Sequence, residues 1–207
     1  MKIHNKLDEI LKQGSKIKIL RLLFIDNDEH TGRGIAKNIH MSASATYTTL
    51  QEMKDEGLLS VRKKGNAILY KLQEDSHIVK KLLRPLFKKE KSLYDDLMSL
   101  VKKYLLTQKK DIVSIALFGS AAQGKETSRS DIDIVIIVKN KRGKEKTDKM
   151  TDQLSIVLAK KFSAAISPYI LTMAEIKEKH LKKQPLIKAI LESNRLIYGK
   201  PIERILA

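Results

Sequence analysis

Two apolar runs in the second half of the chain constrain its fold more than any other feature. Residues 113–118 and 132–138 consist almost entirely of aliphatic and aromatic side chains and have the length of a strand. Both runs therefore predict buried β-strands. From Asp111 onward the pattern continues as strand, turn, strand, helix, strand and helix, which indicates an α/β domain with a small mixed sheet.

The remaining elements of this second domain follow from periodicity and turn residues. A lysine-rich stretch, residues 139–146, predicts a loop that leads into a helix over residues 147–162. A further strand is expected over residues 166–171, and two closing helices are expected over residues 174–182 and 185–193.

The beginning of the chain shows helical spacing of its apolar residues and side chains suited to helix ends. Ser15 is a candidate N-cap of a first helix, and Thr31 can cap a short second helix. Ser42 or Ser44 can start a third helix, which ends at Gly57, where a residue that tolerates positive φ is favoured. The pattern therefore predicts three helices in succession.

A β-hairpin is expected directly after these helices. Residues 58–62 and 67–72 predict two short strands, and the turn between them contains two lysines and a glycine. Three helices followed by a hairpin is the order of a winged helix-turn-helix, and residues 15–72 resemble prokaryotic transcription-regulator domains of that family. The hairpin is the wing of that family.

The chain is expected to have three parts: a winged helix-turn-helix over residues 1–75, a helical connector over 76–108 and an α/β domain over 109–207. Pro85 must start a new helix within the connector or kink it, since proline removes a backbone donor. The connector carries an apolar stripe among lysines. That stripe can form a homodimer with a second copy, or it can cover the core of its own domain.

Charge and composition restrict the partners and the compartment. The net charge is +17, from 41 Lys and Arg against 24 Asp and Glu, which favours polyanions such as nucleic acid but also occurs on proteins whose surface is merely solubilising. There is no cysteine, so disulfides, thiolate zinc sites and cysteine nucleophiles are excluded. Neither a signal core nor an apolar run long enough for a bilayer is present, so we expect a cytoplasmic protein without a membrane partner.

The resemblance to winged helix-turn-helix domains implies that the third helix enters the major groove of double-stranded DNA and that the wing contacts the backbone or minor groove. The candidate DNA-binding residues are polar positions of that helix, which we expect to be exposed, and basic positions of the wing. They are Ser42, Ser44, Thr46, Tyr47, Thr49, Arg62, Lys63 and Lys64. Winged helices also serve as protein-docking modules, and that alternative stays open.

The second domain contains a motif that points to nucleotide chemistry. Gly119 and Ser120 follow the first buried strand, and Asp131 and Asp133 stand at the start of the second. Strand alternation places the two carboxylates on one face, where a divalent cation, most plausibly Mg²⁺, would relieve their repulsion. A glycine lets the backbone come close to a phosphate, and the serine hydroxyl adds a donor.

This Gly-Ser, ten-residue gap, Asp-x-Asp pattern resembles the minimal nucleotidyltransferases of the DNA polymerase β superfamily. The resemblance implies that Gly119 and Ser120 contact the phosphates of a nucleoside triphosphate (NTP), and that the catalytic Asp131 and Asp133 ligate the metal. Family members commonly add a third carboxylate on the next long strand, where this chain has Ser167. A hydroxyl is a weaker magnesium ligand and a poor base, so catalysis is expected to be reduced or lost.

This chain departs from the family pattern at two further places near the motif, and both concern charged residues. Family members often carry an arginine in the turn after Gly-Ser, where this chain has Ala122 and Gln123, and Arg129 is a candidate to compensate. Glu175 lies just beyond the strand of Ser167 and is a candidate third acid, although an ordinary surface glutamate is the simpler interpretation.

Two functions follow as hypotheses. The first is a transcriptional regulator whose nucleotidyltransferase-like domain binds NTP and Mg²⁺. The second is an active enzyme that transfers a nucleoside monophosphate from NTP to a protein, RNA or small-molecule hydroxyl. Resemblance alone adds a special case of the second, in which the enzyme is an antitoxin that modifies a partner toxin protein.

Overall fold

The structure is a computed structural model that describes residues 4–127 and 130–207. The chain divides into two compact units, Met1–Leu93 and Tyr94–Ala207. The division falls inside helix α5 (Arg84–Leu105), so both units share the connector predicted for residues 76–108.

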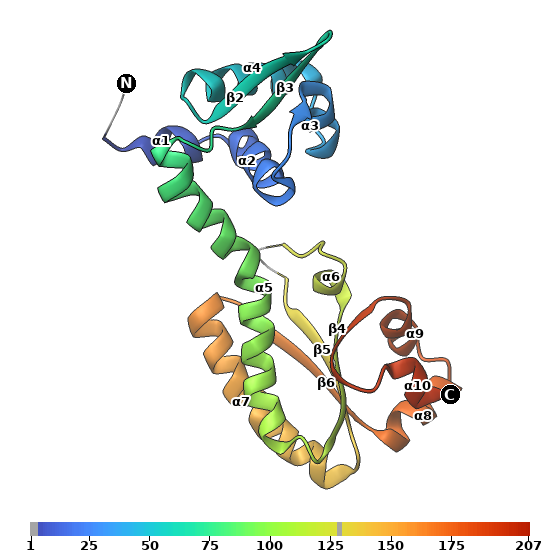
Figure 1. The fold of residues 1–207 in the computed structure, drawn as a ribbon. Helices are drawn as coiled ribbons and strands as arrows, with labels where there is room; N and C mark the ends of the chain where they lie inside the picture. Colours follow the sequence, from blue (N-terminus) through green and yellow to red (C-terminus); the bar gives the residue numbers. More distant parts are fainter. Residues whose placement is uncertain (1–3, 128–129) are drawn as a thin grey trace. The chain divides into compact units, whose positions relative to one another are not determined.

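The first unit is a winged helix-turn-helix, as the sequence predicts (Figure 1). Its small antiparallel sheet has the order β1-β3-β2, and the wing is the hairpin of β2 and β3. The elements are α1 (Lys6–Leu11), α2 (Gly14–Asp26), β1 (His30–Thr31), α3 (Gly32–Asn38), α4 (Ala43–Asp55), β2 (Leu59–Lys64) and β3 (Ala67–Leu72).

Side-chain caps fix the two short helices of the motif where they were expected. The Thr31 hydroxyl accepts a hydrogen bond from the amide of Gly34 at 3.1 Å, and the Ser42 hydroxyl accepts one from Ala45 at 3.2 Å. The expected cap at Ser15 is wrong, because α2 begins at Gly14 and the Ser15 hydroxyl is instead hydrogen-bonded to the Thr49 hydroxyl.

The connector contributes to the first unit before it reaches the second. A π-helix, Val79–Leu83, runs without interruption into α5, and Pro85 is the second residue of α5. The helix changes from π to α at Arg84, next to the proline where a new helix or a kink was expected. Leu83 and Phe87 are buried in the core of the first unit, and the Phe87 ring stacks on that of Phe24 at 4.9 Å between centroids.

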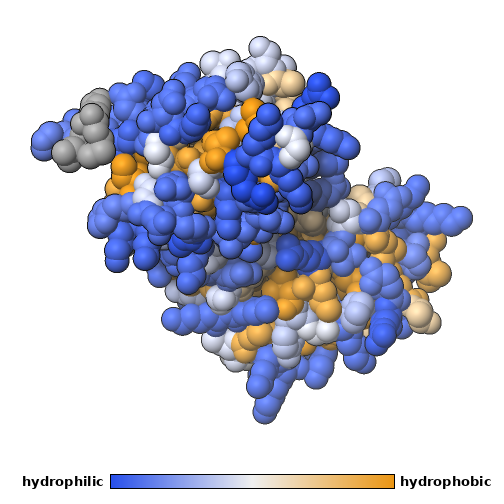
Figure 2. Space-filling model, turned by 45° about the horizontal axis from the view of Figure 1, so that its top comes forward, coloured by the Kyte–Doolittle hydropathy of each residue, from blue (hydrophilic) through white to orange (hydrophobic). Residues whose placement is uncertain are grey.

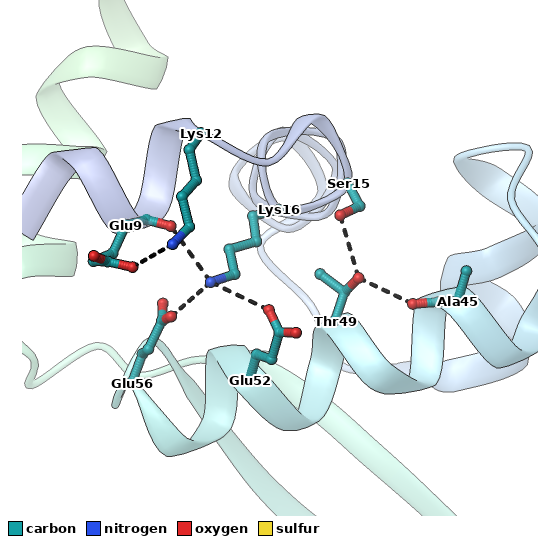
Figure 3. Close-up of polar contacts among 8 residues, drawn as sticks. All are labelled: Glu9, Lys12, Ser15, Lys16, Ala45, Thr49, Glu52 and Glu56. Atoms are coloured by element: carbon teal, nitrogen blue, oxygen red, sulfur yellow. Dashed lines mark hydrogen bonds and ion pairs between the residues drawn. The ribbon is translucent and has the colours of Figure 1, made fainter.

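A buried lysine ties α1, α2 and α4 together (Figure 3). The Lys16 side chain is 2% exposed, and its Nζ lies 2.6 Å from Glu56 Oε1 and 3.4 Å from Glu52 Oε2. The same Nζ donates to the carbonyl oxygen of Glu9 at 3.4 Å. One turn along α4, the hydroxyl groups of Thr49 and Ser15 are hydrogen-bonded, with 3.2 Å between their oxygens. The first turn of α2 therefore holds α4 at two points.

The second unit is built on a four-stranded mixed sheet in the order β6-β5-β4-β7. β5 runs antiparallel to β4 and parallel to β6, and β7 runs antiparallel to β4. The elements after α5 are a 3₁₀ turn (Leu106–Gln108), β4 (Ile112–Phe118), α6 (Gly119–Ala122), β5 (Ile132–Val138), α7 (Lys141–Phe162), β6 (Ile166–Thr172), α8 (Met173–Leu181), α9 (Pro185–Glu192), β7 (Asn194–Gly199) and α10 (Ile202–Leu206).

Both faces of the central strands are buried, which explains their continuous apolar sequence. Alternate residues of β4 and β5 pack against α5 and α7 on one face and against α8, α9 and α10 on the other (Figure 1). Ile134 and Ile136 belong to the first of these cores, and Val135 and Ile137 belong to the second.

Two expectations for this unit are corrected. The lysine-rich residues 139–146 are not a loop, because Asn140 caps α7 by accepting a hydrogen bond from the Gly143 amide at 3.0 Å, and six of these residues lie in that helix. The closing helices are followed by a further strand and a short helix, β7 and α10, that the sequence analysis did not predict.

Hydrophilic residues dominate the molecular surface in the view of Figure 2, and apolar patches lie between them. This surface agrees with the high lysine content of the chain. Among the helices of residues 4–127 and 130–207, none is long and apolar enough to cross a membrane.

The buried lysine yields a stability prediction. Lys16→Ala leaves Glu56 and Glu52 without their cation, so we expect the free energy of unfolding to fall by about 3 kcal/mol. Lys12→Ala is the control, since the Lys12–Glu9 pair is exposed and its loss should change the free energy of unfolding much less. Urea denaturation followed by circular dichroism measures both. Equal effects of the two substitutions would contradict the role given to Lys16.

Candidate functional site

The turn after β4 brings the backbone against a carboxylate. Gly119 has a φ of +70°, and a Cβ atom built on it would lie 2.2 Å from Asp133 Oδ2. Only glycine combines this backbone conformation with such a close approach. Ser120, the next residue, is half-buried in the single-turn helix α6.

The two predicted carboxylates lie together at the start of β5. Asp133 is half-buried and faces the same side of the sheet as Val135 and Ile137, whereas Asp131 precedes the strand and is exposed. Burial raises the pKa of the Asp133 carboxyl, and the nearby charge of Asp131 raises it further. Two carboxylates that repel each other in this way form a donor set suited to a hard divalent cation.

The strand pairing identifies the residue next to this pair. β5 and β6 are parallel, and Asp133 is in register with Ser167, so their side chains lie on the same face of neighbouring strands. Ser167 is exposed. The third carboxylate position expected from the resemblance therefore carries a hydroxyl group, in agreement with the sequence analysis.

Glu175 cannot take that role. It lies in the first turn of α8, beyond the opposite end of β6, and Ser167 is about 16 Å from Thr172 along the strand. Its carboxylate accepts a hydrogen bond from the Thr172 amide at 2.7 Å and pairs with Lys144 Nζ at 3.0 Å. The Thr172 amide and the Lys144 ammonium hold the pKa of Glu175 below its usual value. Glu175 is a structural capping residue.

The two positions in the turn after Gly119 and Ser120, where family members often carry an arginine, have uncharged side chains in this chain. Ala122 is half-buried against the core, and Gln123 is exposed. Arg129, the candidate to compensate for a missing arginine, lies outside the described residues. Within the described part of the chain there is no cluster of three or more His, Asp or Glu residues able to hold a metal ion.

The second candidate site is the exposed face of α4, the third helix of the winged helix-turn-helix. Ser44 is exposed, and Tyr47 is 54% exposed. Ser42 is exposed but its hydroxyl caps the helix. The expectation that Thr46 and Thr49 are exposed is wrong: both are buried, and their hydroxyls donate to carbonyl oxygens one turn earlier, at 2.9 and 3.0 Å.

The three basic wing residues have different surroundings. Arg62 is exposed, but its guanidinium forms a two-bond pair with Glu29 at 2.6 and 2.5 Å. This pairing lowers the pKa of Glu29 and largely neutralises Arg62. Lys63 and Lys64 are exposed and point to opposite faces of β2.

The sequence analysis missed three surface residues near α4. Thr48 is exposed and Gln51 is half-buried on the same helix, and Arg33 is exposed on α3. Helix phase could have found the first two, because Leu50 and Met53 are core residues and fix the buried face. Thr46 and Thr49 were chosen because they are polar, without regard to helix phase.

Comparison with known proteins finds sequence similarity over the second half of the chain. A family model described as polymerase beta, nucleotidyltransferase matches residues 101–203. A curated protein of Methanocaldococcus jannaschii, provisionally named as a protein adenylyltransferase, is 34% identical over 92 residues, which are 44% of this chain and 60% of that protein. The matched stretch thus spans less than two thirds of the relative.

Solved structures show weak likenesses to parts of the chain. Reduced HlyU from Vibrio cholerae has a TM-score of 0.36 and 19% identity, covering 42% of this chain and 84% of that one. A homodimeric winged helix-turn-helix DNA-binding domain from Mycobacterium bovis has a TM-score of 0.34 and 23% identity, covering 44% and 76%. A toxin-antitoxin structure with AMP-PNP has a TM-score of 0.35 and 16% identity, covering 53% and 80%.

The close approach at Gly119 can be tested with a matched glycine. Gly119 and Gly124 have similar positive φ values, +70° and +65°, but a Cβ at Gly124 would meet no atom within 4 Å. We expect Gly124→Ala to cost about 1–2 kcal/mol of stability from backbone strain alone. Gly119→Ala should cost about 1–3 kcal/mol more, because the Asp133 carboxylate must move. Thermal unfolding measures both, and equal losses would contradict this packing.

Proposed function

We propose that this chain, which joins a winged helix-turn-helix domain to a nucleotidyltransferase domain of the polymerase β type, is a cytoplasmic DNA-binding transcriptional regulator whose second domain binds NTP with Mg²⁺. The observation that carries the proposal is the combination of an exposed polar face on α4 with the paired carboxylates beside Gly119. Catalysis by the second domain is reduced or absent.

Charge and exposure support the DNA-binding part. The first unit, residues 1–93, has 19 Lys and Arg against 11 Asp and Glu, so its own field attracts a polyanion. Ser44, Tyr47 and Thr48 present hydroxyl groups on the exposed face of α4, where base edges of a major groove would lie. Lys63 and Lys64 supply charge on the wing.

The experiment for this part is selection of bound duplexes from a random library, followed by affinity measurements at several salt concentrations. The logarithm of the affinity should fall linearly with the logarithm of the salt concentration, with a slope of about −0.9 per phosphate contacted. A selected duplex should bind more tightly than an unrelated one at every salt concentration. Absence of duplex binding at low salt would contradict DNA binding and leave protein docking as the role of this domain.

The second domain has the groups that a metal-bound nucleotide requires. Asp131 and Asp133 would hold Mg²⁺, and Gly119 and Ser120 would face the phosphates. Burial raises the pKa of the Asp133 carboxyl and the nearby charge of Asp131 raises it further, so a cation bound to both carboxylates would offset their repulsion. When bound, the metal would supply positive charge to the triphosphate.

Self-association through residues 76–108 is part of the proposal. Leu83 and Phe87 pack in the first unit, and Val101 and Leu105 pack in the second, so each unit uses part of the stripe for its own core. A separate set of leucines on these helices is 46–48% exposed and available to a second copy. This set consists of Leu82, Leu86 and Leu93.

A second candidate function is active nucleotidyl transfer. In that reaction the oxygen of an acceptor hydroxyl bonds to the α-phosphorus of NTP, the bond to the β-phosphate oxygen breaks, and pyrophosphate leaves with both electrons of that bond. The similarity to a provisionally named protein adenylyltransferase favours a protein acceptor, which includes a partner toxin. Ser167 argues against efficient transfer, since a hydroxyl group neither binds Mg²⁺ well nor accepts the acceptor's proton.

Ser167→Asp separates these two functions. It places a carboxylate next to Asp133. We therefore expect the rate of Mg²⁺-dependent transfer of label from α-labelled ATP to rise by at least tenfold, an increase that a general base can supply. Ser99→Asp, on the exposed surface of α5, adds the same charge elsewhere and should have no effect. Wild-type transfer as fast as that of Ser167→Asp would contradict reduced catalysis and favour the second candidate.

A further inference from the structure

We propose that a hollow between α2 and α5 in the first unit binds a small organic anion, an apolar ring that carries one carboxylate, with Lys88 and Lys91 as the groups that hold the carboxylate. The proposal goes beyond the proposed function, because this site requires neither DNA nor NTP. It adds a ligand site that lies apart from the exposed face of α4 and from the carboxylates of the second unit.

The hollow has a volume of about 690 Å³ and is lined by the last turns of α2 and the first turns of α5. All of its lining residues belong to the first unit. Sites for small molecules usually have volumes of about 300–1,000 Å³ and combine an apolar lining with a few polar groups. The hollow therefore has the size of a small-molecule site.

Apolar side chains from both helices line the hollow. The rings of Phe24 and Phe87 stack at 4.9 Å between centroids, and Phe87 is buried. Ile25, at the end of α2, is 55% exposed. A ligand with an apolar ring would cover Ile25 and the free edge of Phe24, which is favourable because apolar surface leaves water.

The charged groups around the hollow are mostly cations. Its lining includes four basic side chains and one carboxylate, that of Glu90. Arg21 forms a two-bond pair with Glu90 at 2.9 and 2.8 Å, and Arg84 is hydrogen-bonded to Glu74. Two of the four cations therefore have carboxylate partners within the protein.

The other two cations are Lys88 and Lys91, and both are exposed. Among residues 4–127 and 130–207, neither side chain forms an ion pair or a hydrogen bond. They are three residues apart on α5, so their Cβ atoms lie about 5–6 Å from each other on one face of the helix. A single carboxylate can accept hydrogen bonds from both ammonium groups and would offset their repulsion.

The hollow does not compete with the exposed leucines of the connector. Leu86 and Leu93 are seven residues apart and share one face of α5, and Arg84 and Lys91 share another. These two faces are about half a turn apart around the helix axis. A small ligand and a second copy of the chain would therefore occupy different faces of α5.

The test measures binding of naphthalene carboxylate to the full-length protein by the fluorescence of the ligand. The chain has no tryptophan, so the protein contributes little to that signal. We expect saturable binding of one molecule per chain. Naphthalene carboxamide has the same ring without the charge, and it should bind about tenfold more weakly because it loses charge-assisted hydrogen bonds.

Substitutions of the two lysines locate the carboxylate. Lys88→Ala and Lys91→Ala should each weaken binding about threefold, and the double variant should weaken it about tenfold, since both ammonium groups are exposed to solvent. The matched control is the double variant Lys102→Ala, Lys103→Ala, which removes the same charge from exposed positions elsewhere on α5 and should bind like the wild type.

A third pair of variants tests the apolar side of the hollow. Ile25→Asp places a negative charge where the ring and its carboxylate would lie, so we expect binding to weaken at least about tenfold. Ile156→Asp, at a 71% exposed position of α7, adds the same charge elsewhere and should bind like the wild type. Circular dichroism checks that each variant is folded.

Four results would overturn the proposal. They are no saturable binding of naphthalene carboxylate to the wild type, equal binding of the carboxamide, equal losses in the two double-lysine variants, and unchanged binding by folded Ile25→Asp. An affinity that falls as the protein concentration rises would also overturn it, since a second copy would then cover the hollow. None of these results bears on the binding of DNA or NTP, so the proposed function is tested separately.

Discussion

The antiparallel pairing of β4 with β5 is the interaction on which the candidate nucleotide site depends. It places the end of β4 beside the start of β5, so Gly119 meets Asp133 across the sheet. The apolar residues of both strands hold this pair in register by burial on two faces. A half-buried carboxylate, close to a second one, is thereby fixed against backbone at a position where a cation would offset the repulsion.

The parallel pairing of β5 with β6 limits what this site can do. It aligns Ser167 with Asp133, so the neighbouring strand offers a hydroxyl group instead of a carboxylate. Binding of a metal nucleotide needs oxygen ligands and room for phosphates, whereas transfer also needs a base and firm metal positioning. This arrangement supports the proposal that the domain binds a nucleotide rather than transfers one.

Sequence predicted the elements whose signals are local and strong. The β5 boundaries were predicted correctly because an uninterrupted apolar run has few alternatives, and the caps at Thr31 and Ser42 follow from side-chain chemistry. The start of α7 was missed, since lysine density suggested a loop although Asn140 supplies a cap.

Other features depend on tertiary structure and have no local signal. β7 forms because β4 offers a free edge, and its sequence alone shows only a short half-exposed pattern. On α4, Thr46 and Thr49 are buried because helix phase turns them toward the core, where their hydroxyls bond to the backbone. Gly119 and Asp133 could be chosen as site residues from the sequence, but the close approach of the Gly119 backbone to the Asp133 carboxylate could not be predicted from it.

The most direct measurement is the thermal stability of the second domain with and without Mg²⁺ and a nucleoside triphosphate, in the wild type and in Asp133→Asn. The account predicts that the two ligands together raise the unfolding temperature of the wild type, because only the folded site binds them. Asp133→Asn should be at least as stable without ligand, since a repelled charge is removed, and should show no rise. An equal rise in both proteins, or none in the wild type, would contradict the assignment of this site.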